Sequence, residues 1–192
     1  MGYILLEESY IVGYPIVKIP DIPDPDANSF LAGRPIILSF DSPLEFEVLC
    51  PKDEHPGHYF SKVVPVVSEL FIDVLKNSGI DNYQVFPATL VNRDLGCVWE
   101  GFYAFNVIGL VDATDHSASK SDVIMPGGFE GPLELVGYHE IVVDSTKVRN
   151  LRMFRDVRNP TVLIFDDMIE DALDAKRPPE WFGIRIKKLS SS

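Results

Sequence analysis

Residues 161–165 read Thr-Val-Leu-Ile-Phe, an apolar and mostly β-branched run that follows a proline turn. Such a run is typical of a buried strand. Asp166 and Asp167 come next, and either carboxylate can cap a helix, because acidic groups in a first turn favour the positive end of the helix dipole. The pattern therefore predicts a strand over 161–165, a helix over 166–175 and a closing strand over 184–189.

The residues upstream predict one more helix and a hairpin. Ser68 can cap a helix over 68–78, whose apolar residues fall on one face. The apolar runs 83–91 and 97–111 flank a short polar turn, as the strands of a β-hairpin do. Pro87 lies inside the first run, and since proline lacks an N–H, that strand is expected at a sheet edge or a bulge.

The succession of strands with few helices predicts the fold class. Further strands are expected within 1–19 and over 36–40, 44–50 and 133–143. This order indicates an α+β fold, with a mainly antiparallel sheet, about two packed helices and long loops. With 192 residues, the chain is expected to form one domain, 1–192.

Two polar segments predict the long loops. Residues 20–35 repeat Pro and Asp, a composition that excludes a helix and a central strand. Residues 112–132 are rich in Asp, Ser and Gly. Because loops of this length in a compact domain are usually functional or mobile, this second segment is a candidate functional loop.

The composition bounds the class of protein. A hydrophobic content of 46% supplies an ample core, so the fold needs neither a metal nor disulfides. The two cysteines, Cys50 and Cys97, make no disulfide framework. The first residues lack the pattern of a signal peptide, and no apolar run approaches the roughly 20 residues that span a bilayer. We therefore expect a soluble protein of the reducing cytoplasm.

The net charge of −12, from 29 acidic and 17 basic residues, bounds the partners. Phosphate binding needs clustered Lys and Arg, so this charge disfavours nucleic acid, and it disfavours anionic membranes for the same reason. It favours a basic protein partner, because complementary fields speed encounter and orient docking. Acidity that serves solubility alone explains the charge equally well.

The predicted helix over 166–175 is a candidate docking surface. It carries five acids and no base: Asp166, Asp167, Glu170, Asp171 and Asp174. These acids form either a solvated face or a surface for Lys and Arg side chains of a partner. Weaker candidates are Asp21, Asp24 and Asp26 in the proline-rich loop, and Trp181 as an aromatic anchor.

No motif predicts catalysis or a metal. Segment 50–58 holds Cys, Asp and His side chains, but structural zinc usually needs a second ligand pair, and none lies near. Ser117 and Lys120 have the Ser-x-x-Lys spacing of some acyl-transferring enzymes, without the partner motifs of those enzymes. We therefore predict no catalytic residue, no metal and no cofactor.

The ordered series of these elements resembles a family of bacterial immunity proteins, the antidotes encoded beside polymorphic toxins. The resemblance covers roughly residues 60–189, whereas residues 1–60 match nothing. The residues that carry it, which are expected to be structural, are Phe86, Pro87, Asp112, Asp115, Phe154, Arg155 and Gly183. Arg155 is expected to have a structural role, such as pairing an acid near the edge of the core.

The resemblance implies a non-enzymatic protein that binds and neutralises a cognate toxin, and the charge adds that this toxin is basic. Two other functions stay open, as does the oligomeric state. A small hydrolase or transferase would use Ser or His of 112–132 above a pocket with perturbed pKa values. A non-enzymatic assembly protein would pair through a strand edge near Pro87 or at the chain ends.

Overall fold

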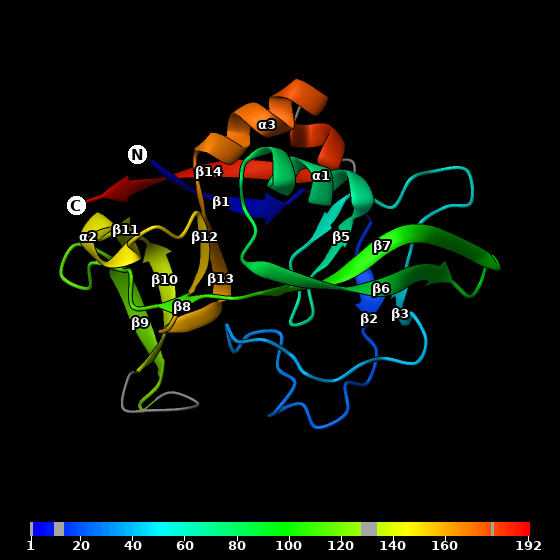
Figure 1. Cartoon of the computed structure of the whole chain (residues 1–192), viewed down its shortest axis with the longest axis horizontal. Coiled ribbons are helices and arrows are strands. Elements are labelled where there is room, and N and C mark those ends of the chain that lie inside the picture. The colour runs from blue at the N-terminus through cyan, green and yellow to red at the C-terminus, as the bar shows by residue number, and fades with distance from the viewer. Residues whose placement is uncertain (1, 10–13, 128–133, 178) are drawn as a thin grey trace.

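The computed structural model describes residues 2–9, 14–127, 134–177 and 179–192. Within these residues the chain forms two six-stranded sheets, one two-stranded sheet and three α-helices (Figure 1). No helix in this part of the chain combines the length and the apolar content needed to cross a membrane. The two chain ends lie side by side, because the first and last strands pair.

The first sheet is built around these two ends. Its strand order is β11-β14-β1-β13-β12-β8. The strands are β1 (Tyr3–Glu8), β8 (Leu110–Val111), β11 (Val142–Val143), β12 (Met153–Asp156), β13 (Asn159–Asp166) and β14 (Ile184–Ser191). β1 runs antiparallel between β13 and β14. The strands predicted over 161–165 and 184–189 are therefore confirmed, and the N-terminal strand joins them into one sheet.

The second sheet has the order β2-β3-β6-β7-β5-β4. Its strands are β2 (Ile16–Lys18), β3 (Leu44–Val48), β4 (Tyr59–Phe60), β5 (Val66–Ser68), β6 (Tyr83–Asn92) and β7 (Cys97–Val107). The predicted hairpin is confirmed as β6 and β7. The single strand expected within 1–19 is wrong, because β1 and β2 belong to different sheets, and Pro15, just before β2, has no N–H to continue a ladder.

Pro87 lies inside the second sheet. β6 has β3 on one side and β7 on the other, so the expectation of an edge strand is wrong. The parallel pairing with β3 begins only at Ala88, and the register with β7 shifts between Ala88 and Leu90. The proline is therefore tolerated because it lies just before the pairing with β3 begins. It also lies next to the shift of register with β7, which agrees with the expectation of a bulge.

The mainly antiparallel sheet is found only in part, since both large sheets are mixed. β3 pairs with β6, β8 with β12, and β11 with β14 in parallel. Each of these pairs joins strands that are not neighbours in sequence, whereas the hairpins are antiparallel. Patterns in neighbouring residues indicate hairpins and carry no information on such distant pairings.

Two helices cover one side of the sheets, as predicted (Figure 1). α1 (Glu69–Asn77) and α3 (Met168–Lys176) pack against each other, and their buried residues share one core cluster with both large sheets. Ser68 caps α1, its Oγ accepting from Phe71 N–H at 3.2 Å. α2 (Ser145–Val148) is a single short turn beside β11.

The predicted loop over 112–132 is wrong in its middle part. β9 (Lys120–Met125) pairs with β10 (Leu135–Glu140) in the two-stranded sheet, which also places the strand predicted over 133–143 as β10 and β11. Residues 128–132 lie outside the described residues. All six residues of β9 are exposed, so this strand lacks the alternation of apolar and polar side chains that identifies strands.

The strand predicted over 36–40 is also wrong. This segment has no strand partner, although Ile36 is buried. Ile36 N–H donates to Gln84 Oε1 at 2.8 Å, and its carbonyl accepts from Gln84 Nε2 at 3.2 Å. A side-chain amide therefore replaces the neighbouring strand as the hydrogen-bond partner of this backbone. The proline-rich segment 20–35 forms neither helix nor strand, as predicted.

Candidate binding surfaces

The acids predicted to form a docking surface differ in exposure. Asp171 and Asp174 are exposed on α3, whose opposite face buries Ile169 and Leu173 in the core. Neither acid forms a salt bridge with another described residue. Both carboxylates are therefore available to a partner.

Asp167 and Glu170 are half-buried, and Asp166 is buried. Asp166 ends β13 and its Oδ1 accepts from Met168 N–H at 3.0 Å, so this carboxylate caps the helix start. Asp167 occupies the cap position without a side-chain cap bond. Glu170 Oε2 lies 3.5 Å from Lys188 Nζ of β14. Because Asp166 is buried, the exposed surface of α3 consists of fewer acids than the sequence spacing predicts.

Trp181 follows α3 in the chain and lies in the 3₁₀ turn η1 (Pro179–Phe182). The residue is 43% exposed, and its ring stacks on His58 with a centroid distance of 4.4 Å. The guanidinium of Arg177 lies 5.5 Å from the indole centroid. Packing on two sides holds the indole in place, which suits an anchor for a protein partner.

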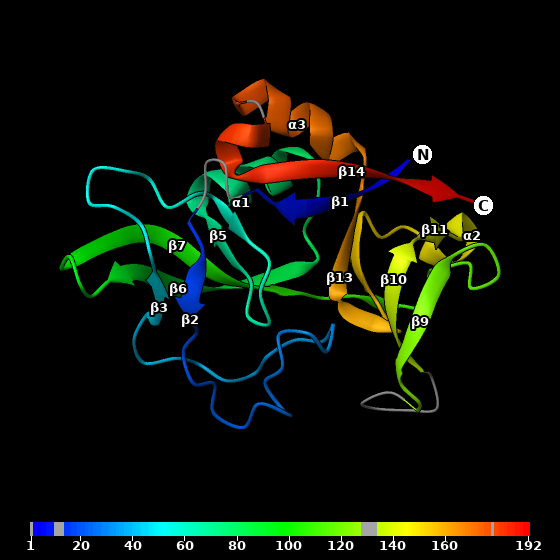
Figure 2. The same ribbon diagram turned by 180° about the vertical axis from the view of Figure 1, so that it is seen from behind.

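The aspartates of the proline-rich loop lie elsewhere. Asp21, Asp24 and Asp26 are all exposed. Their loop lies at the end of the molecule opposite α3 in both views, with the sheets between them (Figures 1 and 2). The structure therefore brings Trp181 near α3 and keeps the loop aspartates apart from it.

The residues that carry the family resemblance occupy structural positions. Phe86 contacts Phe30 and Phe40 edge to face, and the buried Phe154 contacts Tyr3 in the same way. Gly183 has a φ of +76°, which favours glycine between η1 and β14.

Asp112 and Asp115 organise the chain before β9. Asp112 Oδ1 accepts from His116 Nε2 at 2.7 Å, while Asp115 Oδ1 accepts from the Ser117 hydroxyl at 2.7 Å. That hydroxyl bond, followed by backbone bonds, holds the pKa of Asp115 below its usual value. Arg158 Nη1 donates to His116 Nδ1 at 2.8 Å. Both His116 nitrogens are therefore engaged without a serine, and no Ser/His/Asp catalytic arrangement forms at this histidine.

Arg155 does not pair with an acid among the described residues. The side chain is 1% exposed, and its Nη1 donates to the Pro160 carbonyl at 2.7 Å. Its Nε and Nη2 have no hydrogen-bond partner in the described part of the chain. Burial lowers the pKa of this guanidinium to about 10. The acid pair that was one example of its structural role is therefore not formed among the described residues, and Arg155 is a buried cation on β12, the strand between β8 and β13.

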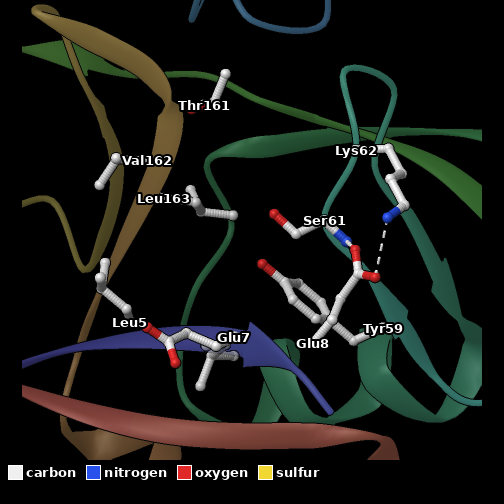
Figure 3. A pocket seen from close by; sticks show the side chains of 10 residues that line it. Leu5, Glu7, Glu8, Tyr59, Ser61, Lys62, Thr161, Val162 and Leu163 are labelled. Carbon is white, nitrogen blue, oxygen red and sulfur yellow. Dashed lines mark hydrogen bonds and ion pairs between the residues drawn. The ribbon is translucent and has the colours of Figure 1, made fainter. Parts of the chain in front are cut away.

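A pocket of about 310 Å³ opens between β1, β13 and the β4–β5 connection (Figure 3). Glu8 accepts a hydrogen bond from Ser61 N–H and forms a salt bridge with Lys62 at 3.1 Å. Burial raises the pKa of Tyr59, another lining residue, to about 12. Within the pocket Glu8 and Lys62 are thus paired with each other, while Glu7 pairs with Arg185 of β14. Tyr59 is unsuited to proton transfer near neutral pH.

The two cysteines, and the histidines of segment 50–58, serve packing. Cys50 and Cys97 are free and buried, and His58 stacks on His55 with centroids 4.2 Å apart. In the described ranges, no three His, Cys, Asp or Glu side chains come together in a way that could hold a metal ion.

One exposed apolar group in β9 is not singled out by any sequence pattern. Val123, Ile124 and Met125 are 52%, 68% and 40% exposed. The only signal in the sequence is three consecutive apolar residues within a segment whose composition predicts a loop.

Comparison with known proteins identifies the family. No curated protein matches the chain. The model of the Immunity protein family (Imm11) matches residues 13–190, which is nearly the whole chain. The match therefore includes most of residues 1–60, which the resemblance seen in the sequence leaves out. The chain belongs to the immunity protein family Imm11, whose general role is the neutralisation of toxins.

Proposed function

We propose that this protein neutralises a cognate toxin by binding it one to one in the cytoplasm, with the exposed acids of α3 and Trp181 facing a basic toxin surface. The family supports toxin neutralisation in general, and immunity families are generally non-enzymatic. The observation that carries the choice of surface is that α3, which bears Asp171 and Asp174, contacts η1, which bears Trp181.

This surface combines the two properties that toxin docking needs. The carboxylates of Asp171 and Asp174, which form no salt bridge within the described part of the chain, attract Lys and Arg side chains and so raise the rate of encounter. The indole of Trp181 is held against His58 and supplies apolar area at little cost in conformational entropy. The net charge of −12 adds a long-range attraction to any basic partner.

The hydrolase alternative has weaker support. It predicts a Ser or His of segment 112–132 above a pocket, yet His116 bonds to Asp112 and Arg158, and Ser117 bonds to Asp115. The nearby pocket of about 590 Å³ is lined by Asp112 from that segment, together with residues of β8 and α2. We therefore keep neutralisation by binding as the proposed function.

The test is co-expression with the toxic product of the adjacent gene, followed by binding kinetics of the purified pair. The wild type should restore growth. Asp171→Lys/Asp174→Lys should slow association by about tenfold and weaken the rescue. Asp21→Lys/Asp26→Lys changes the net charge by the same amount at the opposite end, so it lowers only the long-range attraction and should slow association much less.

Two results would contradict the proposal at different levels. If the wild type neither binds nor rescues, the protein is not the antidote of that toxin. If the wild type rescues but only the Asp21→Lys/Asp26→Lys variant loses affinity, the proline-rich loop is the docking surface and α3 is not.

A further inference from the structure

β9 is an open sheet edge. Its sheet has only two strands, in the order β10-β9, so one side of β9 pairs with β10 and the other has no strand partner in the described residues. β10 lies between β9 and β13, which leaves β9 on the outside of the molecule (Figure 2). The unpaired backbone N–H and C=O groups of such an edge can accept another strand.

The second half of this edge lacks the usual protection. Natural edge strands carry charges or proline that discourage pairing. The charges of β9 lie at its start, where Lys120 Nζ bonds to Glu140 Oε2 at 2.6 Å and Asp122 Oδ2 lies 2.8 Å from His139 Nε2. The apolar residues 123–125 follow without a charge among them, and each is at least 40% exposed.

The hairpin is firmly held on its inner side. Tyr138 OH donates to Asp156 Oδ2 at 2.8 Å, and Asp156 is fully buried at the end of β12. Val136 N–H donates to the Arg158 carbonyl at 2.9 Å, while its own carbonyl accepts from Asn159 Nδ2 at 2.8 Å. The open edge is therefore presented in a fixed position, which reduces the entropy cost of docking a partner.

We propose that the outer edge of β9 is a second toxin contact, to which an extended strand of the cognate toxin adds and turns the β10-β9 pair into a three-stranded sheet. The six residues of β9 offer about 20 Å of edge, enough for about three residues to bond outward. Val123, Ile124 and Met125 contact apolar side chains of the added strand. This contact rests on the proposed neutralisation by binding, but it is independent of the acids on α3.

The net charge of the chain favours the toxin, rather than a second copy of this chain, as the partner that binds the edge of β9. Two copies, each with a net charge of −12, repel one another, whereas a basic toxin is attracted. β9 itself carries one acid, Asp122, and one base, Lys120, so the repulsion between copies comes from the charge of the whole chain. Strand addition between copies is therefore the disfavoured outcome.

The test uses Ile124→Asp in the full chain. If the contact with a basic toxin were purely electrostatic, the added acid would strengthen binding. If residue 124 is buried against an apolar strand, the acid should weaken binding. The toxin Kd should rise by about 30-fold or more. Val98→Asp is the matched control, since Val98 is 61% exposed on β7 of the second sheet. It should leave Kd unchanged.

Amide hydrogen exchange of the wild type gives a second measurement that needs no variant. The amides of 120–125 should gain protection when the toxin binds. Unchanged exchange there, together with wild-type affinity of Ile124→Asp for a toxin that binds, would overturn the edge contact and leave the proposed function intact. Failure of the wild type to bind the toxin would overturn both. Dimerisation of the free chain that Ile124→Asp abolishes, measured by light scattering, would make a second copy the occupant instead.

Discussion

His58 Nδ1 lies 2.8 Å from Ser68 Oγ, and this contact joins the loop before β4 to the start of α1. As the helix cap, Ser68 Oγ already accepts from Phe71 N–H. The hydroxyl can still donate its proton to His58 Nδ1, and because burial disfavours the charged ring, we assign a neutral imidazole with its own proton on Nε2. Both residues are 5% exposed, so a protonated ring would place a charge in a site with little water.

Acid should destabilise the fold through His58. Burial, with a smaller contribution from His55, lowers the pKa of His58 from 6.5 to about 3. Between these values the unfolded chain binds a proton that the folded chain excludes. The contribution to stability is complete above pH 6.5 and is lost as the pH falls toward 3, at up to about 1.4 kcal/mol per pH unit. Chemical denaturation at a series of pH values measures this loss.

The substitution that isolates this effect is His58→Asn. Asparagine keeps an acceptor for Ser68 but gains no proton, so its free energy of unfolding should depend less steeply on pH than that of the wild type. His139→Asn is the control, because it makes the same substitution at an exposed histidine on β10. Equal pH dependence in the wild type and His58→Asn would contradict a neutral, buried His58.

Arg155→Met should leave the free energy of unfolding unchanged or raise it, by up to about 4 kcal/mol, because a buried charge without a paired acid is costly and methionine fills a similar volume. Urea denaturation measures the difference. Arg158→Met is the control, since Arg158 bonds to Glu134 and His116, and this variant should be less stable. A large loss of stability in Arg155→Met would show that its Nε and Nη2 have partners.

The parts of the fold that follow from the sequence are those with strong local patterns. The strand over 161–165 and the helix capped by Ser68 are defined by residues within one element. β9 could not be predicted, because its six exposed residues show no alternation. The error at 36–40 has a different origin, since the partner of Ile36 is the side chain of Gln84, 48 residues away.

The candidate surface was predictable only in part for a similar reason. The spacing of acids on one helical face assumes that the helix begins at Asp166. The structure instead ends β13 at that residue and buries it, so its carboxylate caps α3. The position of Trp181 beside His58 depends on a stack between segments more than 120 residues apart, which no local pattern reveals.

Tyr138→Phe should loosen the β9–β10 hairpin. It removes the hydroxyl that donates to the buried carboxylate of Asp156, at a cost of about 1–3 kcal/mol. Hydrogen exchange of the β10 amides should accelerate more than that of the α1 amides. Tyr103→Phe, at a half-buried tyrosine of β7, should change neither. Equal exchange in wild type and Tyr138→Phe would mean that the backbone bonds of Val136, to the Arg158 carbonyl and from Asn159 Nδ2, suffice to hold the hairpin.

Trp181 and the exposed acids of α3 should act on different rate constants of toxin binding. Asp171→Lys/Asp174→Lys should lower the association rate and its dependence on salt, because steering charges act before contact and are screened by ions. Trp181→Ala should mainly raise the dissociation rate, because an aromatic anchor contributes after docking. Surface plasmon resonance at low and high salt separates the two constants, and thermal unfolding checks that Trp181→Ala, which loses the stack on His58, remains folded. An unchanged dissociation rate in folded Trp181→Ala would place the indole outside the interface, whatever the acids do.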